Sequence, residues 1–203
     1  MIELMQKGGI VMWIILALSL AATVIIIERL LYLRRIRTDE ETLLARLKAT
    51  VQKGHFDEAL NICESNPSPL ANIMKTGLEY RHHEHAVIKD AVVDAASLEI
   101  PKLERYLPSL GTIAHIAPLL GLLGTVTGNI KAFGVLSSFG SMGDPALLSK
   151  GIAEALLTTA AGIVVSIPAI IFYNSLVTRV NHIIIRLENR ANELLVMLKE
   201  KAL

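Results

Sequence analysis

The sequence has little of what disulfide-bonded, metal-binding or nucleic-acid-binding proteins need. Its 203 residues include a single cysteine, Cys63, which excludes a disulfide within the chain and a cysteine-rich metal centre. Aromatic residues make up 4% of the chain, which disfavours an aromatic cage around a ligand. The formal net charge is +1, with acidic and basic residues mixed, so no basic surface for nucleic acid is indicated. Neither a metal ion nor a cofactor is predicted.

Formal charge is also absent from three long stretches of the chain. They lie within 8–28, 109–130 and 154–178, and each is about as long as a helix that crosses the ~30 Å hydrocarbon core of a bilayer. Helices satisfy their backbone hydrogen bonds internally, as lipid requires. No strand pattern is present. The predicted fold class is therefore an all-α integral membrane protein with three transmembrane helices and a helical cytoplasmic domain between spans one and two.

The distribution of lysine and arginine predicts the orientation of the spans. The segment 29–108 holds twelve of these residues and the tail holds five, whereas the N-terminal stub has one and the connection between spans two and three has two. A cleavable signal needs a basic start and a shorter apolar run, so the first span is expected to be retained. The predicted division is 1–7 periplasmic stub, 8–28 first span, 29–108 cytoplasmic helical domain, 109–130 second span, 131–153 periplasmic loop, 154–178 third span and 179–203 cytoplasmic helical tail.

Local signals predict helix boundaries in the first half of the cytoplasmic domain. Thr38 and Glu41 fit a capping box, which predicts that a new helix begins there. Gly54 is a predicted stop for that helix, because glycine readily adopts the left-handed conformation after a helix end. A short helix is then expected over 56–63, ending before the Asn66–Pro67 turn.

The second half of this domain is also predicted to be helical. Ser68 is the predicted cap of a helix that has Pro69 at its first position. A last helix is expected over 84–107, with a kink at Pro101, running directly into span two. The histidine-rich run 81–85 lacks the i, i+4 spacing of helical metal ligands, so we interpret it as a solvated helix start, with a metal site as the weaker alternative.

The second and third spans carry stripes of small residues. Such residues let helix backbones approach closely in lipid, where no hydrophobic effect drives helices together. Pro168 interrupts the third span and leaves the carbonyl of Val164 without its usual donor. The stripe of span two comprises Gly121, Gly124, Thr125 and Gly128, and that of span three comprises Ala155, Thr159, Gly162, Ser166 and Ala169.

Hydroxyl groups on these stripes leave two interpretations open. A threonine in a span can simply bond a carbonyl of its own helix, and the stripes are then packing seams. Several hydroxyls on two paired spans also fit a water-lined path. Those hydroxyls belong to Thr125, Thr127, Thr158, Thr159 and Ser166.

Ionisable residues are scarce in the second and third spans. Glu154 is a functional candidate because a carboxylate in a bilayer is costly, but it also fits an interfacial residue at the outer mouth. His115 is a candidate relay or a hydrogen-bonded interfacial residue. Between 119 and 130, and between 155 and 178, there is no Asp, Glu, Lys, Arg or His. A proton crossing the midplane therefore needs water alone or a carboxylate from another subunit.

Two sequence runs resemble a known family. The runs APLLGLLGTVTG (117–128) and GIAEALLTTAAG (151–162), followed by Pro168, resemble the MotA/TolQ/ExbB proton-channel family. The ExbB/TolQ branch is the best match, because it has three spans and the MotA branch has four. The resemblance implies a homopentamer in the inner membrane of a Gram-negative bacterium, with the N-terminus periplasmic and the C-terminus cytoplasmic.

The resemblance also implies partners and site residues. A dimer of an ExbD/TolR-like single-span subunit would sit in the pore, and its intramembrane Asp would carry the proton. The complex would act on a TonB/TolA-like periplasm-spanning protein in a TonB–ExbB–ExbD or Tol–Pal system. By the resemblance, Thr125, Thr159 and Glu154 belong to the ion path. The hydroxyl stripes add Thr158 and Ser166 to the residues predicted to line it, and the residues predicted for helix packing are Gly121, Gly124, Gly128, Ala155, Gly162 and Pro168.

Other functions are weighed against this one. A non-conducting scaffold for a single-span partner would also need small-residue seams, so the hydroxyls are what separates the two hypotheses. A membrane enzyme is disfavoured, because the spans hold no nucleophile–base pair and no phosphate loop. The sequence leaves open nutrient uptake against envelope maintenance, and proton against sodium coupling.

Overall fold

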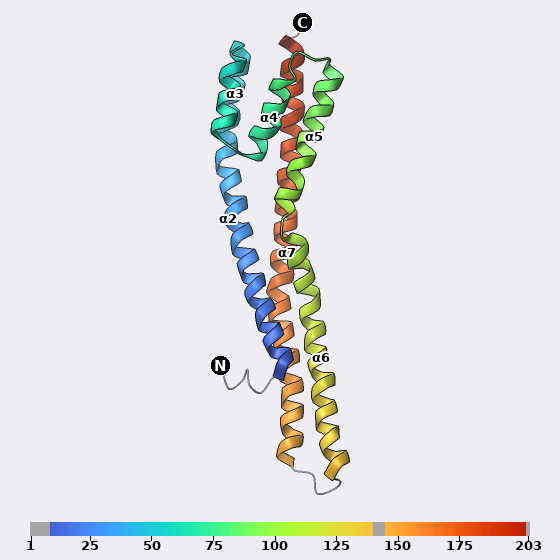
Figure 1. The fold of residues 1–203 in the computed structure, drawn as a ribbon. Helices are drawn as coiled ribbons and strands as arrows, with labels where there is room; N and C mark the ends of the chain where they lie inside the picture. Colours follow the sequence, from blue (N-terminus) through green and yellow to red (C-terminus); the bar gives the residue numbers. More distant parts are fainter. Residues whose placement is uncertain (1–8, 140–144, 202–203) are drawn as a thin grey trace. The chain divides into compact units, whose positions relative to one another are not determined.

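The computed structural model describes residues 9–139 and 145–201, and every regular element in these two ranges is an α-helix. Windows within three helical stretches (Gly9–Lys53, His85–Gly134 and Ser149–Leu198) are long and apolar enough to cross a membrane. The all-α class with three candidate spans is therefore confirmed. The helices are α2 (Gly9–Lys53), α3 (Phe56–Ser65), α4 (Pro69–Glu79), α5 (His85–Glu104), α6 (Leu107–Phe139) and α7 (Pro145–Lys201) (Figure 1).

The chain divides into two compact units. The first unit joins the N-terminal part up to Glu28 with Tyr106–Leu176, and the second joins Arg29–Arg105 with the C-terminal part from Val177 onward. The first unit therefore contains the start of α2, all of α6 and the first part of α7. The second unit contains the rest of α2, α3 to α5, and the rest of α7.

The first unit presents large apolar side chains outward. A membrane-spanning helix requires such a surface, because its outer face contacts lipid chains. Figure 1 shows α6 beside the first part of α7, and small residues lie where these two helices meet. The exposed apolar side chains include Leu119, Leu122, Val126 and Ile130 on α6, and Leu156, Val164, Ile167 and Ile171 on α7.

The second unit has a core of large aliphatic side chains. One buried carboxylate accompanies them: Glu99 on α5 accepts hydrogen bonds from Asn72 Nδ2 on α4 at 2.8 Å and from Lys102 Nζ at 2.6 Å. These two donors satisfy a charge that burial would otherwise penalise. Buried aliphatic residues of this core are Leu44, Leu47 and Val51 on α2, Leu70, Ile73, Met74 and Leu78 on α4, Ile88, Val92 and Leu103 on α5, and Val180, Ile183, Leu187 and Leu194 on α7.

Several predicted helix boundaries are confirmed. α2 ends at Lys53, and Gly54 follows with φ +83°, a conformation that favours glycine. The short third helix ends at Ser65, before Asn66 and Pro67. Ser68 caps α4, since its side chain accepts a hydrogen bond from the backbone N–H of Ala71 at 3.2 Å.

Two boundary predictions are wrong. No helix begins at Thr38, because α2 is continuous from Gly9 to Lys53. That stretch contains no proline and no glycine after Gly9, so nothing in it breaks the helix, and capping residues are tolerated inside one. The helix predicted over 84–107 also does not run directly into span two: α5 ends at Glu104, and Tyr106 has φ +65° before α6 begins at Leu107.

Arg29 stabilises the end of α5. Its side chain is 2% exposed, and Nη1 donates to the carbonyls of Lys102 at 3.2 Å and Leu103 at 3.4 Å. In a continuous helix these carbonyls would accept from residues 106 and 107. The guanidinium, which also stacks on the Tyr32 ring at 4.5 Å, takes the place of those donors.

Candidate functional site in the α6–α7 hairpin

Three glycines bring the backbone of α6 against α7. A Cβ at Gly121 would lie 3.0 Å from the Cα of Thr159, and one at Gly128 would lie 2.7 Å from the carbonyl oxygen of Gly151. A Cβ at Gly124 would overlap the hydroxyl of Thr158. No side chain larger than hydrogen fits at these positions without displacing α7, so the glycine spacing determines how closely the two helices approach.

The facing side of α7 is equally small. A Cβ at Gly162 would lie 2.5 Å from the carbonyl oxygen of Ala117 on α6. Ala155 is buried and contacts the position of Gly128. Pro168 lies outside this contact, on an exposed face of α7. The structure therefore brings together five of the six residues predicted for helix packing.

Two α7 hydroxyls donate across this contact to backbone carbonyls of α6. Ser166 Oγ donates to Ala114 at 2.7 Å, and Thr159 Oγ1 donates to Gly121 at 3.0 Å. Such acceptors are accessible only because the helices are so close. Bonds of this kind between transmembrane helices contribute on average about 0.6 kcal/mol each.

The remaining predicted hydroxyls bond within their own helices. Thr158 is fully buried and donates to the carbonyls of Glu154 and Ala155, each at 3.0 Å. Thr125 is half-buried and donates to the carbonyl of Leu122 at 2.6 Å. Thr125 follows Gly121 by four residues and so lies one turn further along the same face of α6. Thr159, which reaches Gly121, is therefore close to the level of Thr125.

The acid at the start of the third span has a basic partner. Glu154, whose side chain is 12% exposed, accepts a hydrogen bond from Lys131 Nζ at 2.6 Å. This pair was not predicted from the sequence. A usable signal was present, because Lys131 directly follows span two and Glu154 begins span three, and a helical hairpin brings such ends together. His115 is exposed, and its Nδ1 lies 2.6 Å from the carbonyl of Gly111 on its own helix.

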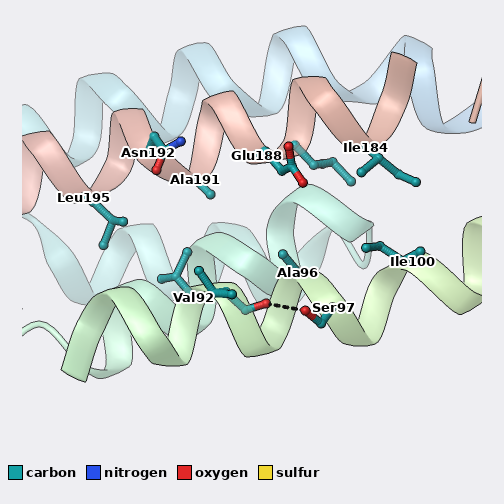
Figure 2. Close-up of a pocket in the computed structure, with 11 residues that line it drawn as sticks. Val92, Ala96, Ser97, Ile100, Ile184, Glu188, Ala191, Asn192 and Leu195 are labelled. Carbon is teal, nitrogen blue, oxygen red and sulfur yellow. Dashed lines mark hydrogen bonds between the residues drawn. The ribbon is translucent and has the colours of Figure 1, made fainter. Parts of the chain in front are cut away.

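The second unit contains a separate groove between α5 and α7. It has a volume of about 250 Å³, and its lining side chains converge from both helices in Figure 2. Ser97, Glu188 and Asn192 are its polar members, and Ser97 Oγ donates to the carbonyl of Val93 at 2.9 Å. The aliphatic remainder favours contact with another apolar surface over chemistry. Its apolar members include Val92, Ala96, Ile100, Ile184, Ala191 and Leu195.

The single cysteine, Cys63, lies in the second unit and is not a reactive nucleophile. Burial raises the pKa of the Cys63 thiol to about 11, with the nearby Lys75 acting in the opposite direction. The thiol therefore stays protonated at neutral pH, when thiolate is the reactive form. Within residues 9–139 and 145–201, no three His, Cys, Asp or Glu side chains are grouped so that they could hold a metal ion.

These features define a helical membrane protein built on a closely packed, hydroxyl-bearing hairpin. A model of the MotA/TolQ/ExbB proton channel family matches residues 65–189, which is more than half of the chain. The chain therefore belongs to this family. It is a family of transport and energy-transducing proteins, not of enzymes.

Relatives named ExbB and relatives named TolQ both match the chain. An ExbB homologue of Methanothermobacter thermautotrophicus is 29% identical over 188 residues, covering 92% of this chain and 66% of the relative. The biopolymer transport protein ExbB1 of Vibrio cholerae is 30% identical over 184 residues, covering 83% and 75%. The Tol–Pal system protein TolQ of Pseudomonas aeruginosa is 34% identical over 151 residues, covering 68% and 65%. The chain thus spans about two thirds of the length of several relatives, and the resemblance to the ExbB/TolQ branch is confirmed.

Proposed function

We propose that this chain is the pore-forming subunit of an inner-membrane, proton-driven motor of the ExbB/TolQ type. One observation carries the proposal: the α6–α7 hairpin carries hydroxyls, but no Asp, Glu, Lys, Arg or His between 119 and 130 or between 155 and 178. Such a hairpin can solvate an ion or a carboxylic acid without trapping it. It has no Asp, Glu, Lys, Arg or His of its own at mid-membrane, and in this proposal a partner subunit supplies the titratable group.

The ion path is proposed to pass Thr125 and Thr159. Both side chains are half-buried at the edge of the α6–α7 contact. Each donates its proton to a backbone carbonyl, Leu122 for Thr125 and Gly121 for Thr159. A hydroxyl that donates in this way still has acceptor lone pairs. Those lone pairs suit a protonated partner carboxyl, which is the neutral form that crosses a membrane at low cost.

The partner proposed for this hairpin is an ExbD/TolR-like single-span subunit, and the driven protein is TonB/TolA-like. Several copies of the chain, expected as a homopentamer, would surround the partner helices. A membrane potential of ~100 mV supplies roughly 2.3 kcal/mol per elementary charge. A few ions per cycle therefore provide enough free energy for a conformational step of ordinary size. The lysine and arginine distribution supports a cytoplasmic location for the second unit in this proposal.

A non-conducting scaffold is the second candidate function, and one observation favours it. Thr159 and Ser166 both use their hydroxyls to join α6 and α7 of the same chain. Hydroxyls with that role stabilise the fold whether or not an ion passes. The scaffold hypothesis therefore accounts for two of the predicted path residues without conduction.

The test replaces the two path hydroxyls one at a time. Thr125→Val and Thr159→Val keep the shape of the side chain and remove its polar group. The chain is co-reconstituted with its single-span partner in vesicles, and ion flux and complex assembly are measured. We expect each variant to assemble normally and to lose at least tenfold in flux, because no other group would solvate the ion at that point of the path. Thr23→Val is the matched control, because Thr23 lies in α2 and bonds Ser19 of its own helix at 2.8 Å. Unchanged flux in both path variants would favour the scaffold.

A further inference from the structure

Three elements of the first unit meet at Glu154. Its carboxylate accepts from Lys131 Nζ of α6 at 2.6 Å. The same oxygen, Oε1, lies against Gly9, the first residue of α2, where an added Cβ would overlap it and lie 3.6 Å from Lys131 Nζ. Gly9, Lys131 and Glu154 thus form one cluster, which we call the junction.

The backbone at Gly9 is suited to this contact. Its φ is +63°, which is accessible to glycine and strained for other residues, and the missing side chain leaves room for the carboxylate. The N–H groups of the first turn of a helix lack partners within the helix and carry partial positive charge. A carboxylate beside that turn is therefore stabilised from α2 as well as from Lys131.

Burial makes this arrangement costly to disturb. The side chain of Glu154 is 12% exposed, whereas that of Lys131 is 59% exposed. Removal of the lysine charge would leave a nearly buried carboxylate with less compensation, which destabilises the state that buries it. Removal of the carboxylate would leave an exposed lysine, which can turn toward solvent at small cost. Loss of the Lys131 charge should therefore destabilise the fold more than loss of the Glu154 charge.

We propose that Lys131 is a positioning residue that holds Glu154 as an anchor for the first turn of α2. Glu154 in this role ties α2 to the α6–α7 hairpin and does not carry the proton. The mechanical part of this inference stands on the junction geometry alone. Its consequence for ion transport rests on the proposed function.

The test uses the full chain with its single-span partner in lipid vesicles. The variants are Lys131→Met, Glu154→Gln, the neutral pair of both, and the exchanged pair Lys131→Glu with Glu154→Lys. Hydrogen exchange of the amides of residues 10–16 and thermal unfolding report on the anchor, and ion flux reports on function. Lys150→Met is the matched control, because Lys150 is an exposed lysine of α7 in the same unit.

We expect Lys131→Met to speed hydrogen exchange in residues 10–16 at least tenfold and to lower the melting temperature by about 3–8 °C. The neutral pair, Lys131→Met with Glu154→Gln, leaves no unpaired buried charge, so it should fold. It should show the same faster exchange in residues 10–16, with a smaller fall in melting temperature. The exchanged pair keeps an ion pair but places an ammonium beside the N–H groups of the first turn of α2, so exchange in residues 10–16 should stay as fast as in Lys131→Met. Glu154→Gln should show the same faster exchange. Lys150→Met should change neither the exchange in residues 10–16 nor the melting temperature.

Two results would overturn the inference. Unchanged hydrogen exchange in both Lys131→Met and the neutral pair would show that the junction does not anchor the first turn of α2. Exchange in residues 10–16 as slow in Glu154→Gln as in the unmodified chain, together with lost flux, would show that the carboxyl carries the ion and does not anchor α2. Absence of flux in the unmodified complex contradicts the proposed function instead, and the exchange data still decide the anchor.

Discussion

In the first unit the helices approach until backbone meets backbone, whereas in the second unit large side chains fill the space between helices. A Cβ at Gly162 would meet the Ala117 carbonyl at 2.5 Å. The second unit also has a crowded glycine, Gly77, but a Cβ there would meet the Leu194 side chain, at 2.6 Å. The same residue type is thus crowded by rigid backbone in one unit and by a movable side chain in the other.

The difference follows from what each surface gains by contact. In lipid, moving a leucine from acyl chains to a helix interface gains little, so helices associate through close packing and backbone acceptors. In water, burying aliphatic area is favourable by roughly 25 cal/mol per Å². The core around Leu78 and Ile73 follows the second rule. Close backbone packing is therefore the arrangement that suits lipid, and a core of large aliphatic side chains is the arrangement that suits water.

The largest expected effect is in the aliphatic core. Leu78→Ala removes a fully buried side chain from α4 and should destabilise the second unit by about 3 kcal/mol, through lost burial and a cavity. Chemical unfolding followed by circular dichroism measures this. Leu98→Ala, at a side chain that is 70% exposed, is the control and should cost far less. Equal losses in the two variants would contradict an aliphatic core here.

Alanine substitutions at the two crowded glycines, Gly162 and Gly77, test the difference between the two units directly. Gly162→Ala should cost about 2 kcal/mol, because α6 must move away from Ala117. Gly77→Ala should cost less than about 1 kcal/mol, because Leu194 can change rotamer and alanine favours helix. Unfolding titrations in mixed detergent–SDS micelles compare both variants on one scale. If the Gly77 variant proved the less stable, backbone contact would not be the distinguishing feature of the first unit.

Loss of one interhelical hydroxyl should have a smaller effect. Ser166→Ala removes the 2.7 Å bond to the carbonyl of Ala114 and should cost about 0.6 kcal/mol. The same micelle titration measures it. Thr112→Val is the control, because that hydroxyl is exposed and bonds Pro108 of its own helix at 2.9 Å. A cost above about 2 kcal/mol for Ser166→Ala would mean that the bond belongs to a larger network.

The smallest effect should come from an ion-pair cluster of the second unit. Hydrogen bonds from Lys48, and then from Arg190, hold the pKa of Glu193 below its ordinary value of 4.5. A lowered pKa in the folded state stabilises it above pH 4.5, and this contribution is lost as pH falls through the folded-state value. Because the side chains are partly exposed, we expect at most about 0.5 kcal/mol.

The measurement is thermal unfolding from pH 7 to pH 3 for the unmodified chain and for Glu193→Gln. The variant should remove a small part of the acid destabilisation, and 1 M salt should reduce the difference further. A difference that grows with salt would contradict an electrostatic origin.

Much of the fold was predictable because its signals are local. Ser68, Pro69 and Gly54 act through their own backbone geometry, so the boundaries they predict are confirmed. The capping pair at Thr38 failed, because a capping residue permits a helix start without requiring one. Tyr106 gave no sign of a break, since a non-glycine residue with φ +65° has no sequence signature.

The three apolar spans and the glycine spacing of the hairpin follow from the sequence, because charge-free length and residue size are properties of the chain alone. The hydrogen-bond partners of Ser166 and Arg29 depend on the tertiary structure. Ser166 bonds Ala114 of α6, and Arg29 bonds the end of α5. These acceptors are backbone carbonyls, which every residue carries, so the approach of the helices selects which carbonyl is bonded.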